Sequence, residues 1–161
     1  MHIWTIKKWV KHLDYYASNY RKGLRLRIDK DVDPEVKRAC KEFCQWIRSE
    51  YYFPVRVPVY IKATKHIKAL DGELVSATFF SPFDKKDEPY ARVSAGDFQE
   101  LSKEQGKDNA LAAILGSVAH ELTHYFQWIN GVVLTEIGEE RQAKAYVGFI
   151  LDEYAETREH P

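Results

Sequence analysis

The sequence predicts an α+β fold: N-terminal helices, then a small and mostly antiparallel sheet, then two C-terminal helices. Apolar residues recur at every third or fourth position in several stretches, which indicates amphipathic helices. In the middle of the chain, apolar and polar residues alternate in short runs, which indicates strands with one buried face. The 161 residues, 45% of them hydrophobic, suit one core, so we assign residues 1–161 to a single domain.

The composition argues against several classes of protein. The formal net charge is zero and the isoelectric point is near 7, so we expect neither a nucleic acid nor an anionic membrane surface as a partner. No apolar run approaches the length of a membrane span, and residues 1–11 lack the apolar stretch of a signal peptide. We therefore expect a cytoplasmic protein.

The first predicted helix covers residues 1–20. Its apolar side chains follow a helical spacing: Ile3, Ile6, Trp9, Val10, Leu13, Tyr16 and Tyr20. We interpret this segment as an amphipathic helix that packs on the domain. The alternative is a docking face for a partner, or a segment that covers an active site.

A short strand, Leu24–Asp29, and a second helix follow. The pair Asp33-Pro34 begins this helix, because Asp caps helix N-termini and Pro suits the first helical position. An apolar stripe continues the helix to about residue 50. Cys40 and Cys44 lie one turn apart on or beside the stripe. Since there is no second cysteine pair to complete a metal site, we interpret both as small core residues.

Further alternating runs predict the rest of the sheet. Residues 55–63 read as a half-buried strand. Because Pro58 cannot donate a hydrogen bond to a neighbour, we expect this strand either to be an edge or to be unpaired on the side of the proline. Asp71-Gly72 predicts a hairpin turn between two short strands. Residues 90–95 alternate once more and form the last predicted strand.

A short helix and a long one come next. Asp97 with Glu100 resembles a capping box for the short helix. The long helix begins at Asp108 or Asn109 and ends at Asn130-Gly131. One broad face of it is apolar. A second stripe carries small and polar side chains: Ala113, Ser117, His120, His124 and Gln127, with Glu121 beside it.

The residues His120-Glu121-Leu122-Thr123-His124 match the HExxH pattern. Two imidazoles four positions apart on a helix point the same way and can bind one zinc ion. Glu121 can then hold and deprotonate a water molecule on that metal. A catalytic zinc ion usually has a third protein ligand, and no histidine follows His124 until His160, so we expect a carboxylate.

The candidates for the third ligand lie at the start of the last predicted helix, residues 137–154. They are Glu136, Glu139 and Glu140. Helical geometry places Glu139 and Glu140 on either flank of the inner face of this helix, so periodicity does not choose between them.

The segment Glu140-Arg141-Gln142-Ala143, followed by Tyr146, resembles the Glu-x-x-Ala signature of gluzincin-type metallopeptidases. Residues 118–151 as a whole resemble the ImmA/IrrE-type family and the minimal single-domain gluzincins. This resemblance implies a zincin-like fold, with Glu140 as the third zinc ligand beside His120 and His124. Leu122-Thr123 departs from the usual Leu-Gly or Ile-Gly, and we expect Thr123 to face away from the metal.

The resemblance also implies zinc-dependent hydrolysis of a peptide bond in a specific protein target, with Glu121 as general base. It favours an edge strand, for which we consider residues 90–95, as the place where an extended peptide binds. Candidates for a second contact to the oxyanion are His66, Tyr90, Tyr125 and Tyr146. The alternative function is a non-catalytic zincin-like domain that binds a metal and a partner protein. A third interpretation is an accidental match to HExxH.

Overall fold

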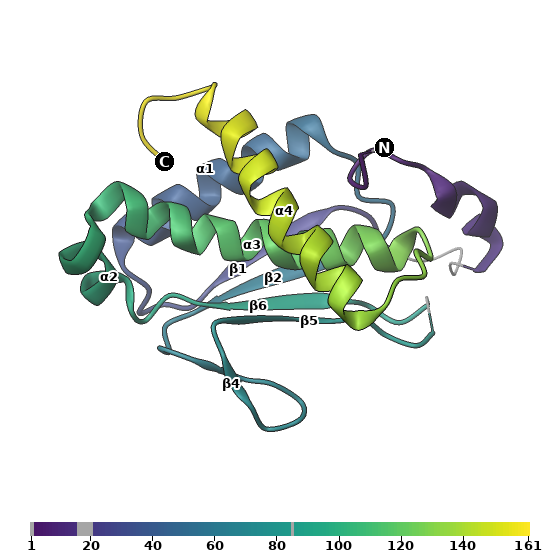
Figure 1. Cartoon of the computed structure of the whole chain (residues 1–161), viewed down its shortest axis with the longest axis horizontal. Helices are drawn as coiled ribbons and strands as arrows, with labels where there is room; N and C mark the ends of the chain where they lie inside the picture. The colour runs from purple at the N-terminus through teal and green to yellow at the C-terminus, as the bar shows by residue number, and fades with distance from the viewer. Residues whose placement is uncertain (1, 16–20, 85) are drawn as a thin grey trace.

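The computed structural model describes residues 2–15, 21–84 and 86–161 (Figure 1). The helices and strands follow in this order: a 3-10 helix η1 (Lys8–Tyr15), β1 (Leu24–Ile28), α1 (Pro34–Glu50), β2 (Val57–Lys62), β3 (Ile67–Lys68), β4 (Leu74–Val75), β5 (Ala77–Phe80), β6 (Tyr90–Ser94), α2 (Phe98–Gln105), α3 (Lys107–Ile129) and α4 (Glu136–Ala155). The α+β class predicted from the sequence is confirmed. No helix in the described residues is long and apolar enough to cross a membrane.

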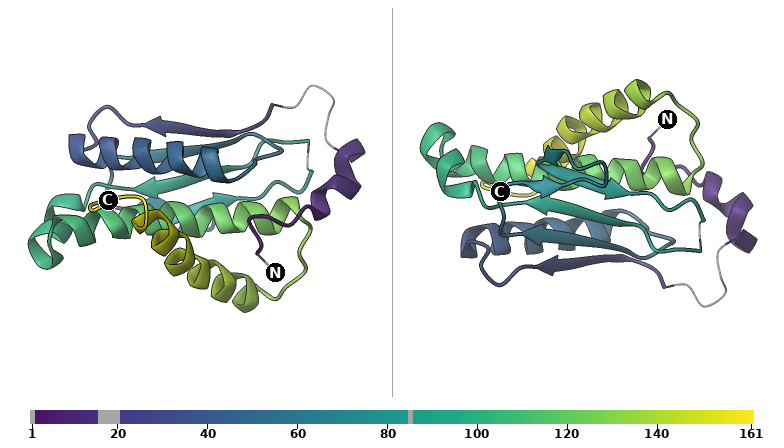
Figure 2. Two further views of the ribbon diagram at one scale, coloured as in Figure 1. Left: turned by 90° about the horizontal axis from the view of Figure 1, so that it is seen from above. Right: turned by 90° about the horizontal axis from the view of Figure 1, so that it is seen from below.

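Helices cover one face of a four-stranded sheet, and α4 packs on the outside of α3 (Figures 1 and 2). Seen from below, the strands lie in front of α1 and α3 (Figure 2). The strand side chains that point toward the helices are apolar, and Leu24, Val59 and Val93 among them are fully buried. Alternate positions such as Arg25 and Arg27 face solvent. Burial of this apolar face against α1 and α3 holds the two layers together.

The prediction of a mostly antiparallel sheet is wrong. The strand order is β1-β2-β6-β5, and both β1 and β6 run parallel to β2, so that only the β5–β6 pair is antiparallel. The reason lies in the connections. Helix α1 carries the chain from the end of β1 back to the start of β2, which makes a β-α-β crossover and forces a parallel pair. The antiparallel hairpin β3–β4 forms a separate small sheet.

The edges of the main sheet are β1 and β5, so neither residues 55–63 nor residues 90–95 form an edge strand. Strand β2 lies inside the sheet. The N–H of Val57 donates toward β1, so the nitrogen of the next residue, Pro58, faces β6. Pairing with β6 begins only at Val59, so Pro58 leaves no hydrogen bond unmade. The second alternative, a strand unpaired on the side of the proline, is therefore confirmed at this position. Strand β6, predicted over residues 90–95, is also an inner strand. The edge beside the motif helix is β5.

Several boundaries follow the local signals in the sequence. Asp33 caps α1, because its side chain accepts a hydrogen bond from the backbone N–H of Glu35 over 2.8 Å. The β3–β4 hairpin turns at Gly72, whose φ of 88° suits a residue without a side chain. Helix α3 ends at Ile129, immediately before the predicted stop at Asn130.

The short helix α2 exists, but the capping box predicted for it is absent. The Asp97 side chain makes no cap hydrogen bond, and Glu100 instead forms an ion pair with Lys65. Gly106 then separates α2 from α3, which begins at Lys107, slightly earlier than predicted.

The N-terminal segment is less helical than its periodicity predicts. Residues 3–15 form a turn and then η1, and residues 16–20 of the predicted helix lie outside the described residues. The segment packs on the domain through Trp4, which is 2% exposed. The ring centroids of Phe126 and Tyr51 each lie 5.0 Å from that of Trp4. The start of the segment, at Ile3 and Trp4, therefore packs on the domain.

Cys40 and Cys44 are core residues, as predicted. Both are fully buried and both thiols are free. Burial raises the pKa of Cys44 to about 12, so the thiol is uncharged at neutral pH. These two side chains fill space under α1.

Candidate metal centre

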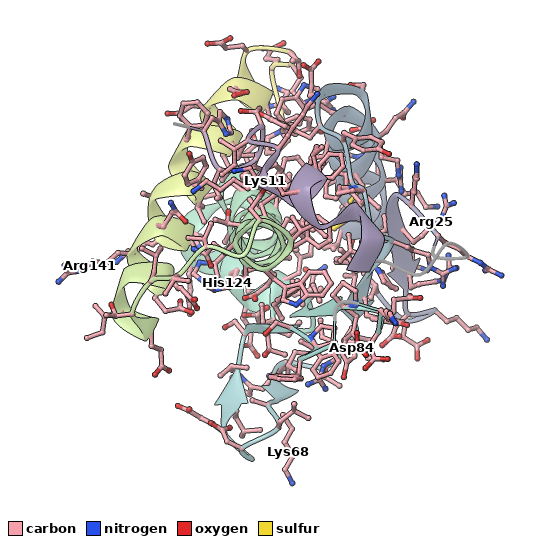
Figure 3. The ribbon with its side chains drawn as sticks, turned by 90° about the vertical axis from the view of Figure 1, so that its right-hand side faces the viewer. Lys11, Arg25, Lys68, Asp84, His124 and Arg141 are labelled. Atoms are coloured by element: carbon pink, nitrogen blue, oxygen red, sulfur yellow. The ribbon has the colours of Figure 1, made fainter. Side chains whose placement is uncertain are left out.

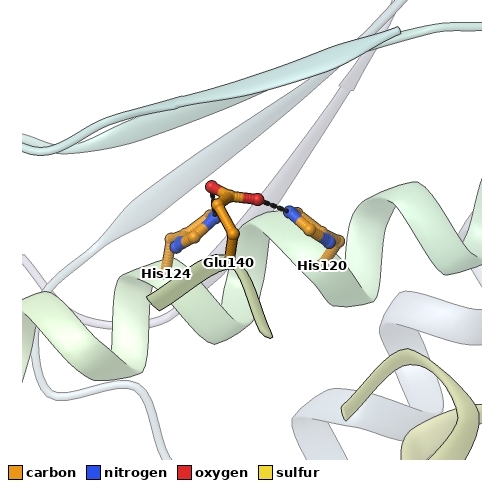
Figure 4. Close-up of side chains that lie close together, drawn as sticks. All are labelled: His120, His124 and Glu140. Atoms are coloured by element: carbon orange, nitrogen blue, oxygen red, sulfur yellow. Dashed lines mark hydrogen bonds and ion pairs between the residues drawn. The ribbon is translucent and has the colours of Figure 1, made fainter. Parts of the chain in front are cut away.

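Two helices bring three potential metal ligands together. On α3, His120 and His124 lie one turn apart on the same side, because a helix completes a turn in about 3.6 residues. In the end-on view of α3 in Figure 3, His124 lies toward α4. Helix α4 presents Glu140 to both imidazoles (Figure 4). Its Oε2 lies 3.0 Å from Nε2 of His120, and its Oε1 lies 2.9 Å from Nε2 of His124.

These three side chains could hold a metal ion. One donor atom from each lies within 4.8 Å of the other two. Two imidazole nitrogens and one carboxylate oxygen are ligands that catalytic zinc sites use, and tetrahedral bonds of about 2 Å separate neighbouring ligand atoms by roughly 3.3 Å. The distances from Glu140 to His120 and His124 are a few tenths of an ångström shorter than that spacing. Small side-chain movements would therefore accommodate zinc.

The environment of the group favours a neutral His120. The side chains of His120 and His124 are 25% and 13% exposed, while that of Glu140 is 57% exposed. Burial, and then the neighbouring His124, lower the pKa of His120. A lowered pKa keeps the imidazole unprotonated near neutral pH, and this is the form that binds metals.

The two other glutamates that periodicity left open, Glu136 and Glu139, lie nearby but outside this group. Both line the same groove as Glu140. The backbone carbonyl of Glu139 accepts a hydrogen bond from Nε2 of Gln127 over 3.0 Å. Among the described residues, Glu140 is the carboxylate that meets both imidazoles. It is also the glutamate that the family resemblance implies.

Gln127 orients His124, a role that the sequence analysis missed. Nε2 of Gln127 donates hydrogen bonds to the carbonyl of Glu139 and, over 2.9 Å, to Oε1 of Gln142. Oε1 of Gln127 therefore faces Nδ1 of His124, 2.7 Å away, and accepts a hydrogen bond from it. With this proton on Nδ1, the lone pair of His124 lies on Nε2, the nitrogen that would bind a metal ion held between it and Glu140.

The sequence did contain a signal for this role. Gln127 follows His124 by three positions, and residues three apart on a helix lie on the same face.

Glu121 lies beside the group in a largely buried position. It is 5% exposed, yet it lines both cavities that meet at His120. Burial, and then the negative charge of Glu140, raise the pKa of Glu121 to about 8. A carboxyl group with a pKa in this range can accept and release a proton near neutral pH, as a general base and acid must.

A groove of about 1050 Å³ runs past the group, between α3, the start of α4 and the edge strand β5. Ala77 and Phe79 of β5 form part of one wall, and His124 and Trp128 form part of another. A second cavity of about 610 Å³ continues from His120 along α3. Small side chains leave this space open: Ala112, Ala113, Gly116 and Ser117. Ala113 and Ser117 belong to the second stripe of α3 identified in the sequence. An extended ligand therefore has room on both sides of the glutamate of the motif.

The four candidates for a second oxyanion contact are not supported, since none lines either cavity in the described residues. The hydroxyl groups of Tyr125 and Tyr146 are hydrogen-bonded to backbone groups elsewhere. Tyr90 contacts the ring of Phe80 at a centroid distance of 5.1 Å, and His66 is exposed before β3.

Thr123 faces away from the group, as predicted. It is buried, and its hydroxyl donates to the carbonyl of Ala119 and accepts a hydrogen bond from Trp4. Residues 2–11, whose side chains the structure describes, line neither cavity. This part of the chain packs behind the motif and does not cover the groove.

Comparison with protein-family models, with curated protein sequences and with solved structures gave no match. The function of the site must therefore be argued from the residues and geometry of this chain.

Proposed function

We propose that this chain is a zinc-dependent peptidase of the gluzincin type, with a zincin-like fold, that hydrolyses a peptide bond in a specific protein target. One observation carries the proposal. His120, His124 and Glu140 converge on one point beside the buried Glu121, at the meeting of two open cavities. This combination supplies the ligands and the general base that hydrolysis by a metal-activated water requires.

The donor set supports zinc as the metal. His120, His124 and Glu140 would be its ligands, which leaves one tetrahedral position for water or substrate. Bound zinc would supply Lewis-acid chemistry, lowering the pKa of a water molecule and polarising a substrate carbonyl. Gln127 would keep His124 in the tautomer that ligation needs, since its amide is itself held by two hydrogen bonds.

Glu121 would act as the general base. Its carboxylate would accept a proton from the attacking water, and the resulting carboxyl group would donate that proton to the leaving amine. Its position next to His120 on the walls of both cavities and its raised pKa support this role. The low exposure of Glu121 also limits competing hydrogen bonds from solvent.

An extended peptide suits the site as a substrate. Strand β5 is the edge of the sheet that borders the groove, so its unpaired backbone groups can receive a peptide as an added strand. In this proposal β5 takes the place of residues 90–95, which lie inside the sheet. The peptide would then pass between β5 and the helix that carries Glu121 and His124.

The substitution Glu121→Gln tests the proposal, because it removes the base and keeps the shape of the side chain. We expect elemental analysis to find about one zinc ion per chain in both the wild type and the variant. We expect the wild type to cleave members of a proteome-derived peptide library, detected by mass spectrometry. Cleavage by E121Q should fall at least about 100-fold. Glu139→Gln is the matched control, because Glu139 lines the same groove. This substitution should change neither the zinc content nor the rate of cleavage.

Two other results would redirect the interpretation. Bound zinc without cleavage of any library peptide by the wild type would favour the non-catalytic alternative, a domain that binds a metal and a partner protein. No zinc in the wild type, even after zinc is supplied at neutral pH, would contradict the peptidase proposal and leave the HExxH match accidental.

A further inference from the structure

The second edge of the sheet, β1, borders a groove that the proposed chemistry does not use. This groove has a volume of about 690 Å³ and lies between β1 and α1, at the opposite edge of the sheet from β5. Its floor is apolar, because Leu26 and Ile28 are partly buried against the core. The other lining residues form one stripe of α1: Lys37, Lys41, Gln45 and Arg48.

The backbone of β1 is open to pairing along this groove. Along this strand the odd-numbered residues direct their backbone N–H and C=O groups toward β2. The N–H of Asp29, for example, donates a hydrogen bond over 2.9 Å to the carbonyl of Ile61 in β2. Strand alternation therefore turns the N–H and C=O groups of Leu26 and Ile28 away from β2, toward the free edge. The preceding outward carbonyl, that of Leu24, accepts a hydrogen bond over 2.9 Å from a guanidinium on the last turn of α1.

Cations without carboxylate partners surround this free edge. We define the basic edge as Arg25, Arg27, Lys37, Lys41 and Arg48. In the described part of the chain none of them forms an ion pair, whereas Arg38, Lys65 and Lys107 do. The formal net charge of the whole chain is zero, so the basic edge is a local excess of positive charge that acidic residues elsewhere in the chain balance. Figure 3 shows Arg25 pointing outward on the opposite side of the molecule from Arg141.

We propose that β1 binds an extended acidic segment of a partner protein as an added strand. The outward backbone groups of Leu26 and Ile28 pair with the segment. Because side chains alternate along a strand, carboxylates on one face of the segment meet Arg25 and Arg27. Side chains on its other face rest on Leu26 and Ile28, beneath Lys41. A nucleic acid strand would meet the same cations but would leave the backbone groups and the apolar floor without a partner, so the peptide is favoured.

The test uses a fluorescent probe peptide of about seven residues in which Glu and Val alternate, matching the length of a short strand. We expect saturable binding to the full chain, measured by fluorescence anisotropy, with mass spectrometry checking that the probe stays uncut. Arg27→Glu and Lys41→Glu should each weaken binding about tenfold. Lys103→Glu, the same charge change on an exposed residue of α2, is the control and should leave the affinity within about twofold.

A second readout reports the backbone pairing itself. Bound probe should slow hydrogen exchange at the amides of Leu26 and Ile28, and a probe with alternate N-methylated amides should bind at least about tenfold more weakly. Three results would overturn the proposal: equal binding of the methylated probe, tighter binding of an oligothymidylate of equal charge, or no saturable binding. In the last case the cations only protect the edge from aggregation.

Discussion

The indole nitrogen of Trp4 donates a hydrogen bond over 3.0 Å to the hydroxyl of Thr123, which lies within the HExxH motif. Trp4 is 2% exposed, and Thr123 is fully buried. The bond joins the N-terminal segment to the side of α3 that faces away from Glu140. We infer that this segment supports the motif from behind and fixes the rotation of α3 about its axis.

Replacing the indole should weaken the fold. We expect Trp4→Phe to lower the free energy of unfolding by about 1–3 kcal/mol, because the Thr123 hydroxyl loses its donor and the smaller ring packs less well. Urea denaturation measures this change. In a double-mutant cycle with Thr123→Ala, we expect a coupling free energy of about 1 kcal/mol. Purely additive losses would show that the hydrogen bond contributes nothing, and Thr5→Ala, at an exposed residue of the same turn, serves as the control.

Removing the acceptor for His124 should weaken zinc binding. We expect Gln127→Leu to lower the zinc affinity about 10–100-fold, because Nδ1 of His124 loses its partner and the imidazole can rotate. Competition against a chromophoric chelator measures the affinity. Gln127→Glu keeps an oxygen acceptor and should recover most of the loss, whereas Gln45→Leu, on exposed α1 surface, should have no effect. Equal affinities in all three variants would remove Gln127 from the site.

Local sequence signals predicted α1, α3 and α4 well, because a 3.6-residue period is a property of a single segment. Strand direction is different. Alternation along Leu24–Ile28 and Val57–Lys62 is the same in parallel and antiparallel sheets, so it does not report direction. The helix between these strands carried the missing information, since a strand, a helix and a strand in succession favour a parallel crossover pair. The order of strands that leaves β5 at the edge depends on tertiary packing.

The residues of the candidate site show the same difference between features of a single helix and features of tertiary packing. The spacing of His120 and His124 is a property of one helix, so the sequence predicted their shared face. The choice between Glu139 and Glu140 depends on how α4 crosses α3, which periodicity within α4 does not contain. The crossing turns the Glu140 side chain toward both imidazoles and leaves the backbone of Glu139 to accept the Gln127 hydrogen bond.

Gly96 permits a close approach of two backbone segments between β6 and α2. A Cβ atom at this position would lie 2.4 Å from the carbonyl oxygen of Ala63 and 2.5 Å from the carbonyl carbon of Thr64. Because backbone cannot move aside as a side chain can, we expect Gly96→Ala to destabilise the fold by about 2–4 kcal/mol. Gly148→Ala, where nothing lies within 4 Å, should instead stabilise α4 by up to about 1 kcal/mol. Thermal unfolding of both variants checks these opposite signs.

Glu121 should make the metal-free protein less stable as the pH rises. A glutamate carboxyl group in water has a pKa of 4.5, whereas that of Glu121 in the folded protein has a pKa of about 8, raised first by burial and then by Glu140. Between these values the folded state binds more protons than the unfolded state, so the free energy of unfolding falls with increasing pH. The stabilising effect of the proton is complete below pH 4.5 and is lost as the pH passes 8.

We therefore expect Glu121→Gln to remove part of this pH dependence. At pH values above 8, with a chelator present, the free energy of unfolding of the variant should exceed that of the wild type by roughly a few kcal/mol. Urea denaturation at a series of pH values measures the difference between the two proteins. Parallel curves for the wild type and E121Q would show that Glu121 is not held in a proton-binding environment.

The identity of the third ligand gives the sharpest test of the metal site. Glu140→Gln keeps the size of the side chain but replaces an anionic oxygen with a neutral amide, so we expect zinc affinity to fall at least about 100-fold. His124→Ala should have a comparable effect. Glu139→Gln changes the charge of the groove by the same amount on the adjacent residue, and should leave the affinity within about threefold. If E139Q lost zinc and E140Q kept it, α4 would have to rotate by about one residue relative to α3 to ligate the ion, and the hydrogen bond from Gln127 to the Glu139 carbonyl would not survive that rotation.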